Sequence, residues 1–287
     1  MSRTEYKLAR DECRAESVPP ESFRAPDARG RVYLVGAGPG DPELITVKGL
    51  RCLRAADVVV YDRLANPSLL DEVPAHAELI FVGKRTGYCS LRQAEINTLL
   101  IEQARLGRSV VRLKGGDPCI FGRGGEEAQA LAEAGIAFEI VPGVSSAVAV
   151  PAYAGIPVTQ RGQSGVITIV TGHEQPGRSS SLVDWEVLAK VDGTLVILMG
   201  VATLPTITQQ LLQGGMARET PAAAIEQGTT SRQRQVTGTL ATIAERAVAA
   251  GLRSPAVVVI GRVVELSATL SWFTPPVEES VQRMLAK

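Results

Sequence analysis

The chain has 287 residues, of which 45% are hydrophobic and 21% charged, and its 30 lysines and arginines balance 30 aspartates and glutamates. This length is enough for two ordinary domains. The zero net charge excludes a general electrostatic attraction to nucleic acid, so an anionic ligand has to be met by local arginines. The sequence also lacks an apolar run near the ~18 residues of a membrane-spanning helix.

Residues 1–30 are polar and lack the apolar core of a signal peptide, so we expect a disordered extension there and a short tail over residues 275–287. The four cysteines form no CxxC pair, and neither of the two histidines lies near a cysteine at ligand spacing. The sequence therefore predicts no metal site, and free thiols indicate a reducing, cytoplasmic location.

Between residues 31 and 145, short β-branched segments alternate with helical patterns. We expect strands at 31–35, 57–61, 77–82, 109–113 and 138–141, and helices at 46–56, 90–107 and 124–135. The strand segments are apolar on both faces, which predicts that they are buried. Their alternation with helices predicts a mostly parallel sheet covered by helices on both faces.

A second alternating series follows over residues 146–274. We expect strands at 165–172, 194–200, 222–228, 234–238 and 255–261, with helices near 203–213 and 240–250. The small-residue stretch 141–165 joins the two series. The predicted fold class is therefore α/β, with one α/β domain over 31–145 and a second over 146–274.

The segment RVYLVGAGPGDPELITVKG, residues 31–49, has the look of a dinucleotide-binding turn. That fingerprint needs GxGxxG entering a helix directly. Here Gly40 comes one position early, Pro39 and Pro42 interrupt the turn, and the helix start is postponed to about Thr46. Since GK[ST] is also missing, the pattern argues against both a dinucleotide-binding oxidoreductase and a Walker loop.

Seven segments in order indicate a different family. They are YLVGAGPGDPELITVKG, VVVYDRL, FVGKR, VVRLKGGDPCIFGRGGEE, VPGVSSAVAVPAYAGIPVT, LVILMG and SPAVVVIGRVV. Together they span roughly residues 31–273. In these segments the sequence resembles the tetrapyrrole methyltransferase family. The resemblance implies two α/β domains with the active site in the cleft between them, S-adenosylmethionine as cofactor (S-adenosylhomocysteine as its product), and a homodimer.

The resemblance also assigns residues to the cofactor. These are Pro39, Gly115, Gly116, Asp117, Ile120, Ser145, Ser146, Met199 and Gly228. Two alternatives stay open: Asp117 as a turn aspartate that accepts backbone amides, and Met199 as a core residue. The family usually has Thr-Ala where this chain has Ser145-Ser146, so Ser145 keeps the hydroxyl and Ser146 replaces a small apolar residue with a small polar one.

A tetrapyrrole with eight carboxylates needs arginines inside the cleft. Next to the family segments, the candidates are Arg63, Arg123 and Arg161, with Glu126 as an acceptor for pyrrole N–H groups. The alternative for Arg63 and Arg123 is a surface ion pair. The resemblance makes Asp62 the proton acceptor and Lys84 the proton donor. The alternative for each group is that it only positions the substrate.

The expected reaction is methylation of uroporphyrinogen III at two ring carbons (C2 and C7), giving precorrin-2 through precorrin-1. That product feeds sirohaem, cobalamin or haem d1, and the residues do not distinguish these pathways. A related methyltransferase acting on a later precorrin, or on the diphthamide intermediate, is the first alternative. Some family members carry a fused oxidase and ferrochelatase module, for which this sequence has no segment, so we expect methylation alone.

Overall fold

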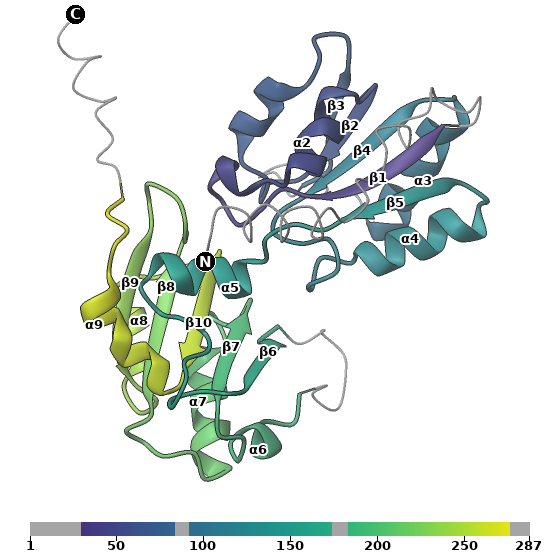
Figure 1. The fold of residues 1–287 in the computed structure, drawn as a ribbon. Helices are drawn as coiled ribbons and strands as arrows, with labels where there is room; N and C mark the ends of the chain where they lie inside the picture. The colour runs from purple at the N-terminus through teal and green to yellow at the C-terminus, as the bar shows by residue number, and fades with distance from the viewer. Residues whose placement is uncertain (1–29, 84–91, 174–182, 276–287) are drawn as a thin grey trace, which may run out of the picture.

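The structure is a computed structural model that describes residues 30–83, 92–173 and 183–275 (Figure 1). The predicted extension and tail fall almost entirely outside these residues, as does Lys84. Two five-stranded sheets form the centres of two separate bodies, and residues 142–145 carry the chain from the first body into the second (Figure 1).

The first sheet is entirely parallel, with the strand order β3-β2-β4-β1-β5. Its strands are β1 (Arg31–Gly36), β2 (Val58–Tyr61), β3 (Glu78–Phe81), β4 (Ser109–Lys114) and β5 (Ala137–Val141). The central strands are buried, as the sequence predicts, but the edge strands β3 and β5 are largely half-exposed or exposed. Burial on both faces was therefore the wrong expectation for these two strands, because an edge strand has a neighbour on one side only.

Helices cover both faces of this sheet. They are α2 (Val47–Arg54) on one face, and α3 (Gln93–Arg105) and α4 (Gly124–Glu133) on the other. The predicted start of α2 is confirmed, since the Thr46 hydroxyl accepts a hydrogen bond from the Gly49 amide at 3.0 Å. Two short 3₁₀ helices, Pro42–Leu44 and Pro67–Glu72, follow β1 and β2 at the carboxyl edge of the sheet.

The second sheet is mixed, with the order β6-β7-β10-β8-β9. Its strands are β6 (Ile167–Thr171), β7 (Thr194–Leu198), β8 (Pro221–Glu226), β9 (Arg234–Thr239) and β10 (Ala256–Ile260). Only the β6–β7 pair is parallel, whereas β10 runs antiparallel to both β7 and β8. This arrangement brings the carboxyl ends of β7 and β8 and the amino end of β10 to the same edge.

Helices also cover both faces of the second sheet. Helix α5 (Ser146–Tyr153) packs on one face, and α6 (Trp185–Leu188), α7 (Leu204–Gln213) and α8 (Ile243–Ala249) pack on the other. After β10 come the 3₁₀ helix Arg262–Leu266 and α9 (Ser267–Leu270). In the part of the chain that the structure describes, we find no helix with the length and apolarity to cross a membrane.

Glycines allow the chain to pack tightly where β1 and β5 end. A Cβ atom on Gly36 would lie 2.5 Å from the Cα atom of Gly143, and one on Gly143 would lie 2.3 Å from the Gly116 carbonyl oxygen. These distances are too short for any side chain, so both positions require glycine. The backbones after β1, β4 and β5 therefore touch directly.

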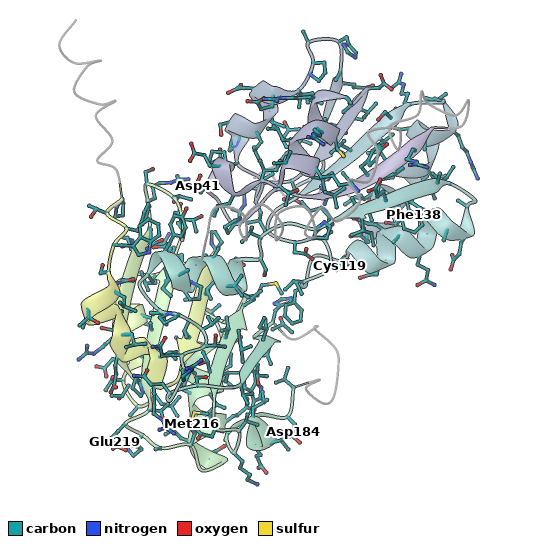
Figure 2. The ribbon with its side chains drawn as sticks, in the orientation of Figure 1. Asp41, Cys119, Phe138, Asp184, Met216 and Glu219 are labelled. Carbon is teal, nitrogen blue, oxygen red and sulfur yellow. The ribbon has the colours of Figure 1, made fainter. Side chains whose placement is uncertain are left out.

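The first domain also contacts the second through Asp41, which lies where the two bodies meet (Figure 2). The Asp41 amide donates to the Thr229 hydroxyl at 3.0 Å, and the Tyr153 hydroxyl donates to the Asp41 carboxylate at 2.8 Å. Burial, and then this hydrogen bond, raise the pKa of Tyr153 to about 12. The rings of Trp272 and Phe273 pack against Tyr153 and complete this contact.

Candidate active site

A cavity of about 580 Å³ lies between the two domains. The loops after β1, β2 and β4 line it from the first domain, and α5 with the ends of β7, β8 and β10 line it from the second. Most of the predicted site residues line this cavity. They are Pro39, Asp62, Arg63, Gly115, Gly116, Ile120, Arg123, Ser146, Met199 and Gly228.

Four predicted residues lie elsewhere. Both carboxylate oxygens of Asp117 accept backbone amides, from Cys119 at 2.8 Å and from Gly143 at 3.1 Å, which is the turn role weighed as the alternative. Ser145 caps α5 by accepting from the Ala147 amide. Glu126 and Arg161 are exposed and do not line the cavity.

Asp62 directly follows β2, and its carboxylate is held at both oxygens. One oxygen accepts from the Leu64 amide at 3.0 Å, and the other accepts from the Arg112 guanidinium at 3.0 Å. The side chain is 23% exposed, against 5% for that of Arg112. These two contacts fix the orientation of the carboxylate at the cavity wall, where it can accept a hydrogen bond from a bound molecule.

Arg112, Lys114 and Glu127 were missed by the sequence reasoning. Arg112 and Lys114 line the cavity from β4, and both contact the wholly buried Glu127 of α4, at 3.2 and 2.9 Å. Burial, and then the neighbouring Arg112 cation, lower the pKa of Lys114 below its usual value. The available signal was the spacing, because two cations two residues apart in an otherwise apolar strand lie on the same face.

Arg123 and Glu126 form an exposed, two-point ion pair at the cavity rim, with contacts of 2.9 and 2.7 Å. The hydrogen bonds from Arg123 hold the pKa of the Glu126 carboxyl below its usual value. The backbone of Arg123 is left-handed, with φ of 61°, at the residue that precedes α4. Arg63 and, from the second domain, Arg232 are further exposed cations of the lining.

Two glycines of the cavity lining pack closely against other parts of the chain. A Cβ on Gly40 would meet the side chains of Thr229 and Thr230, and one on Gly115 would meet Leu64, at 2.5 to 2.8 Å. These glycines, like Gly36, therefore make room for neighbouring chain segments. Gly116 is different, because its nearest neighbour would be the Ser146 nitrogen at 3.7 Å.

The second domain gives the cavity an apolar wall. Its side chains come from α5 and the strand ends and are Val150, Leu198, Met199, Ile225 and Val257. Met199 is 46% exposed and has φ of 55°, so it is not a core residue. Across the described ranges 30–83, 92–173 and 183–275, we find no group of three or more His, Cys, Asp or Glu residues able to hold a metal ion.

The family follows from a sequence profile. The profile of the Tetrapyrrole (Corrin/Porphyrin) Methylases matches residues 31–244. The chain belongs to this family. Among its relatives is an S-adenosyl-L-methionine-dependent uroporphyrinogen III methyltransferase from Methanosarcina barkeri, which is 54% identical over 83% of this chain and 93% of the relative.

Other tetrapyrrole methylases are similar to this one in sequence and structure. The uroporphyrin-III C-methyltransferase of Thermus thermophilus, solved with S-adenosylhomocysteine, is 42% identical and superimposes with a TM-score of 0.71 over 83% of this chain and all of that one. A siroheme synthase from Chromobacterium violaceum is 51% identical over 86% of this chain, which spans only 52% of that protein. The structural match confirms the predicted α/β fold of the tetrapyrrole methyltransferase type.

Proposed function

We propose that this tetrapyrrole methylase transfers methyl groups from S-adenosylmethionine to two ring carbons (C2 and C7) of uroporphyrinogen III, giving precorrin-2 through precorrin-1. The observation that carries the proposal is the cavity between the domains, whose first wall brings Asp62, Arg63 and Arg123 together and whose second wall is apolar. The relatives named as uroporphyrinogen III methyltransferases, which match this chain over most of its length, support the same reaction.

The cavity has features that fit S-adenosylmethionine. Gly116, at φ of 68°, presents backbone without a side chain, and Ser146, the first residue of α5, lies beside it in the cavity lining. Together they offer peptide groups and the amino end of a helix to a polar ligand. Close by, Val150, Leu198 and Met199 offer apolar surface. S-adenosylmethionine supplies an electrophilic methyl group. The lining residues proposed to hold it are Pro39, Gly115, Gly116, Ile120, Ser146, Met199 and Gly228. The cofactor roles of Asp117 and Ser145, which lie outside the lining, stay predictions from the resemblance.

The protein's own residues bind the tetrapyrrole and move a proton. Arg63 and Arg123 pair with substrate carboxylates, and Glu126 accepts pyrrole N–H bonds when Arg123 turns to the substrate. Asp62 accepts the proton that the pyrrole releases as its carbon is alkylated. The apolar wall excludes water from the reacting carbon. The roles of Lys84 as proton donor and of Arg161 as a carboxylate partner stay predictions.

Incubating the protein with uroporphyrinogen III and S-adenosylmethionine, and measuring the product mass, tests this function. We expect the mass to rise by two methyl groups, with a transient singly methylated species. Calorimetry should show binding of S-adenosylhomocysteine and none of NAD. Methylation of precorrin-2 in place of uroporphyrinogen III would favour a later step of corrin synthesis, and tight NAD binding would overturn the assignment.

We further propose a cytoplasmic homodimer. The resemblance to a family of homodimeric enzymes supports the assembly, and the predicted free thiols support the reducing compartment. Light scattering coupled to gel filtration measures the assembly directly. A mass equal to one chain at working concentration would contradict the dimer and leave the proposed reaction untouched.

A further inference from the structure

At the wall that carries Asp62, the first domain contains a cluster of charged side chains, which we call the buried cluster: Arg112, Lys114 and Glu127. Their side chains are 5%, 5% and 0% exposed. Three donors converge on one oxygen of Glu127, namely Arg112 Nε at 3.2 Å, Lys114 Nζ at 2.9 Å and Gln93 Nε2 at 3.1 Å. The other oxygen, Oε2, is buried and has no hydrogen-bond partner among the residues that the structure describes.

The guanidinium of Arg112 connects this cluster to the cavity. Its Nε donates to Glu127, and its Nη1 donates to the Leu113 carbonyl at 3.0 Å and to the Val60 carbonyl at 3.4 Å. The remaining nitrogen, Nη2, donates to Asp62 at 3.0 Å. A planar guanidinium held at three fixed points has one orientation, and that orientation points Nη2 at Asp62.

Stability alone does not account for the cluster. Taking ionised groups out of water is costly, and apolar residues of similar volume often stabilise a core as well or better. Among the described residues Oε2 finds no hydrogen-bond partner, whereas most buried polar atoms have one. Such an arrangement beside a cavity is typical of a functional site.

We propose that Arg112 and Glu127 are positioning residues for the methyl-transfer reaction. Arg112 holds the Asp62 carboxylate in the orientation that faces the substrate, and Glu127 holds Arg112. This inference rests on the proposed function, in which Asp62 accepts a proton. The orientation of Asp62 is then set by Arg112 of β4 and Glu127 of α4, in addition to the Leu64 amide of its own loop.

A double-mutant cycle tests the role of Arg112. Arg112→Lys keeps the positive charge but loses the forked guanidinium. We expect kcat to fall by about 10- to 100-fold, as for a small misplacement of a reacting group. The KM for uroporphyrinogen III should change by less than about threefold. In an Asp62→Asn background the same change should lower kcat by less than about threefold, because the group that Arg112 positions has lost its function. Equal effects of Arg112→Lys in both backgrounds would overturn the positioning role.

Glu127→Gln keeps the size and one acceptor oxygen and provides a second variant if Arg112→Lys folds poorly. It should lower kcat in the same direction, and again only while Asp62 is intact. Bound S-adenosylhomocysteine per chain measures the folded fraction in every sample. A kcat per folded molecule equal to that of the wild type would make Glu127 a purely structural residue and overturn its assignment.

Arg54→Lys is the matched control, because Arg54 makes a two-point ion pair with Glu72 outside the cavity lining. It should leave kcat within about twofold of the wild type, as expected for an exposed ion pair. Wild-type turnover is measured first. Absence of methylation in the wild type overturns the proposed function, whereas normal wild-type turnover with additive variants overturns only the positioning role.

Discussion

The two walls of the cavity differ in chemistry. The first domain contributes Asp62, Arg63, Arg112, Lys114 and Arg123, whereas the second contributes mostly apolar side chains and backbone, with Arg232 as its charged residue in the lining. In the proposed function, charge recognition and proton transfer therefore fall mainly to the first domain. The second domain contributes mostly apolar surface to the cavity.

The strand directions explain this division. In the parallel first sheet, every strand ends at the same edge, so the loops after β1, β2 and β4 all reach the cavity. In the mixed second sheet, β10 runs against its neighbours and enters the cavity edge with its first residues, Ala256 and Val257. Strand residues packed against α5 therefore face the cavity from the second domain, whereas the first domain contributes mainly loops, together with Arg112 and Lys114 of β4.

Asp62→Asn changes the charged wall of the first domain and should have the largest effect on turnover. The amide keeps the size of the side chain and an acceptor for the Leu64 N–H, but it loses basicity. Turnover should fall by about 10²- to 10⁴-fold, the usual contribution of a general base. Rapid-quench kinetics under saturating substrate measures this rate.

Binding of S-adenosylhomocysteine by Asp62→Asn should barely change, which calorimetry checks. Near-normal turnover would remove Asp62 from the proton-transfer role and leave it as a group that only positions the substrate. Lys84→Met should lower turnover similarly if Lys84 donates a proton.

Arg123→Ala tests whether the charged wall binds carboxylates. Uroporphyrinogen III binding should weaken by about 2–4 kcal/mol, as for a charge pair that loses water on binding, while cofactor affinity stays the same. Arg262→Ala is the control, since Arg262 forms an exposed ion pair with Asp192, away from the cavity. If both variants bind the substrate equally well, Arg123 makes only the surface pair with Glu126.

Gly228→Ala tests the shape of the second wall. The added methyl group would lie 2.3 Å from a Val150 side-chain carbon, so the wall has to shift. We expect a loss of about 1–3 kcal/mol in unfolding free energy by urea titration, as for overpacking, together with weaker S-adenosylhomocysteine binding. Gly165→Ala adds its methyl group to open space and should change neither quantity. Equal behaviour of the two variants would mean that shape at Gly228 does not matter.

Tyr153→Phe has the smallest expected effect and tests the contact between the walls. The phenol donates to Asp41, and its folded pKa of about 12 lies above the ordinary value of 10.0. The stabilisation, about 1 kcal/mol, is therefore complete below pH 10 and is lost as the pH rises toward 12. The difference in unfolding free energy between wild type and variant should shrink over that window. A difference that stays constant over that window would show that folding does not raise the pKa of Tyr153.

Much of this fold is predictable from sequence because two signals are local: the periodicity of apolar residues, and the residues that begin or end helices and strands. The strand β4 followed from an apolar run, and the start of α2 near Thr46 followed from the point where the helical pattern resumes. The direction of β10 did not, since an apolar run has the same pattern whichever way its neighbours run. The ion pair of Arg112 with Asp62 was also not predictable, because the two residues are 50 positions apart and meet only when β2 and β4 pair.

The site residues show the same limit. Family resemblance led to Asp62 and Gly116, but only the packed structure reveals that the carboxylate of Asp117 is used by two amides of its own chain. Residue type at a position predicts which chemistry is available. The partner that each polar group binds depends on contacts between segments that are distant in sequence.

The glycine contact at the end of β1 bears on how evolution has constrained this enzyme. Gly36 and Gly143 meet backbone to backbone, so any descendant that keeps this crossing must keep glycine at both sites, whatever molecule it methylates. Selection at these two positions would preserve the backbone contact, independently of the ligand that the protein binds. In a comparison of many descendants these positions would stay as constant as a true reactive group, and their constancy would record a meeting of chain segments and not a catalytic act.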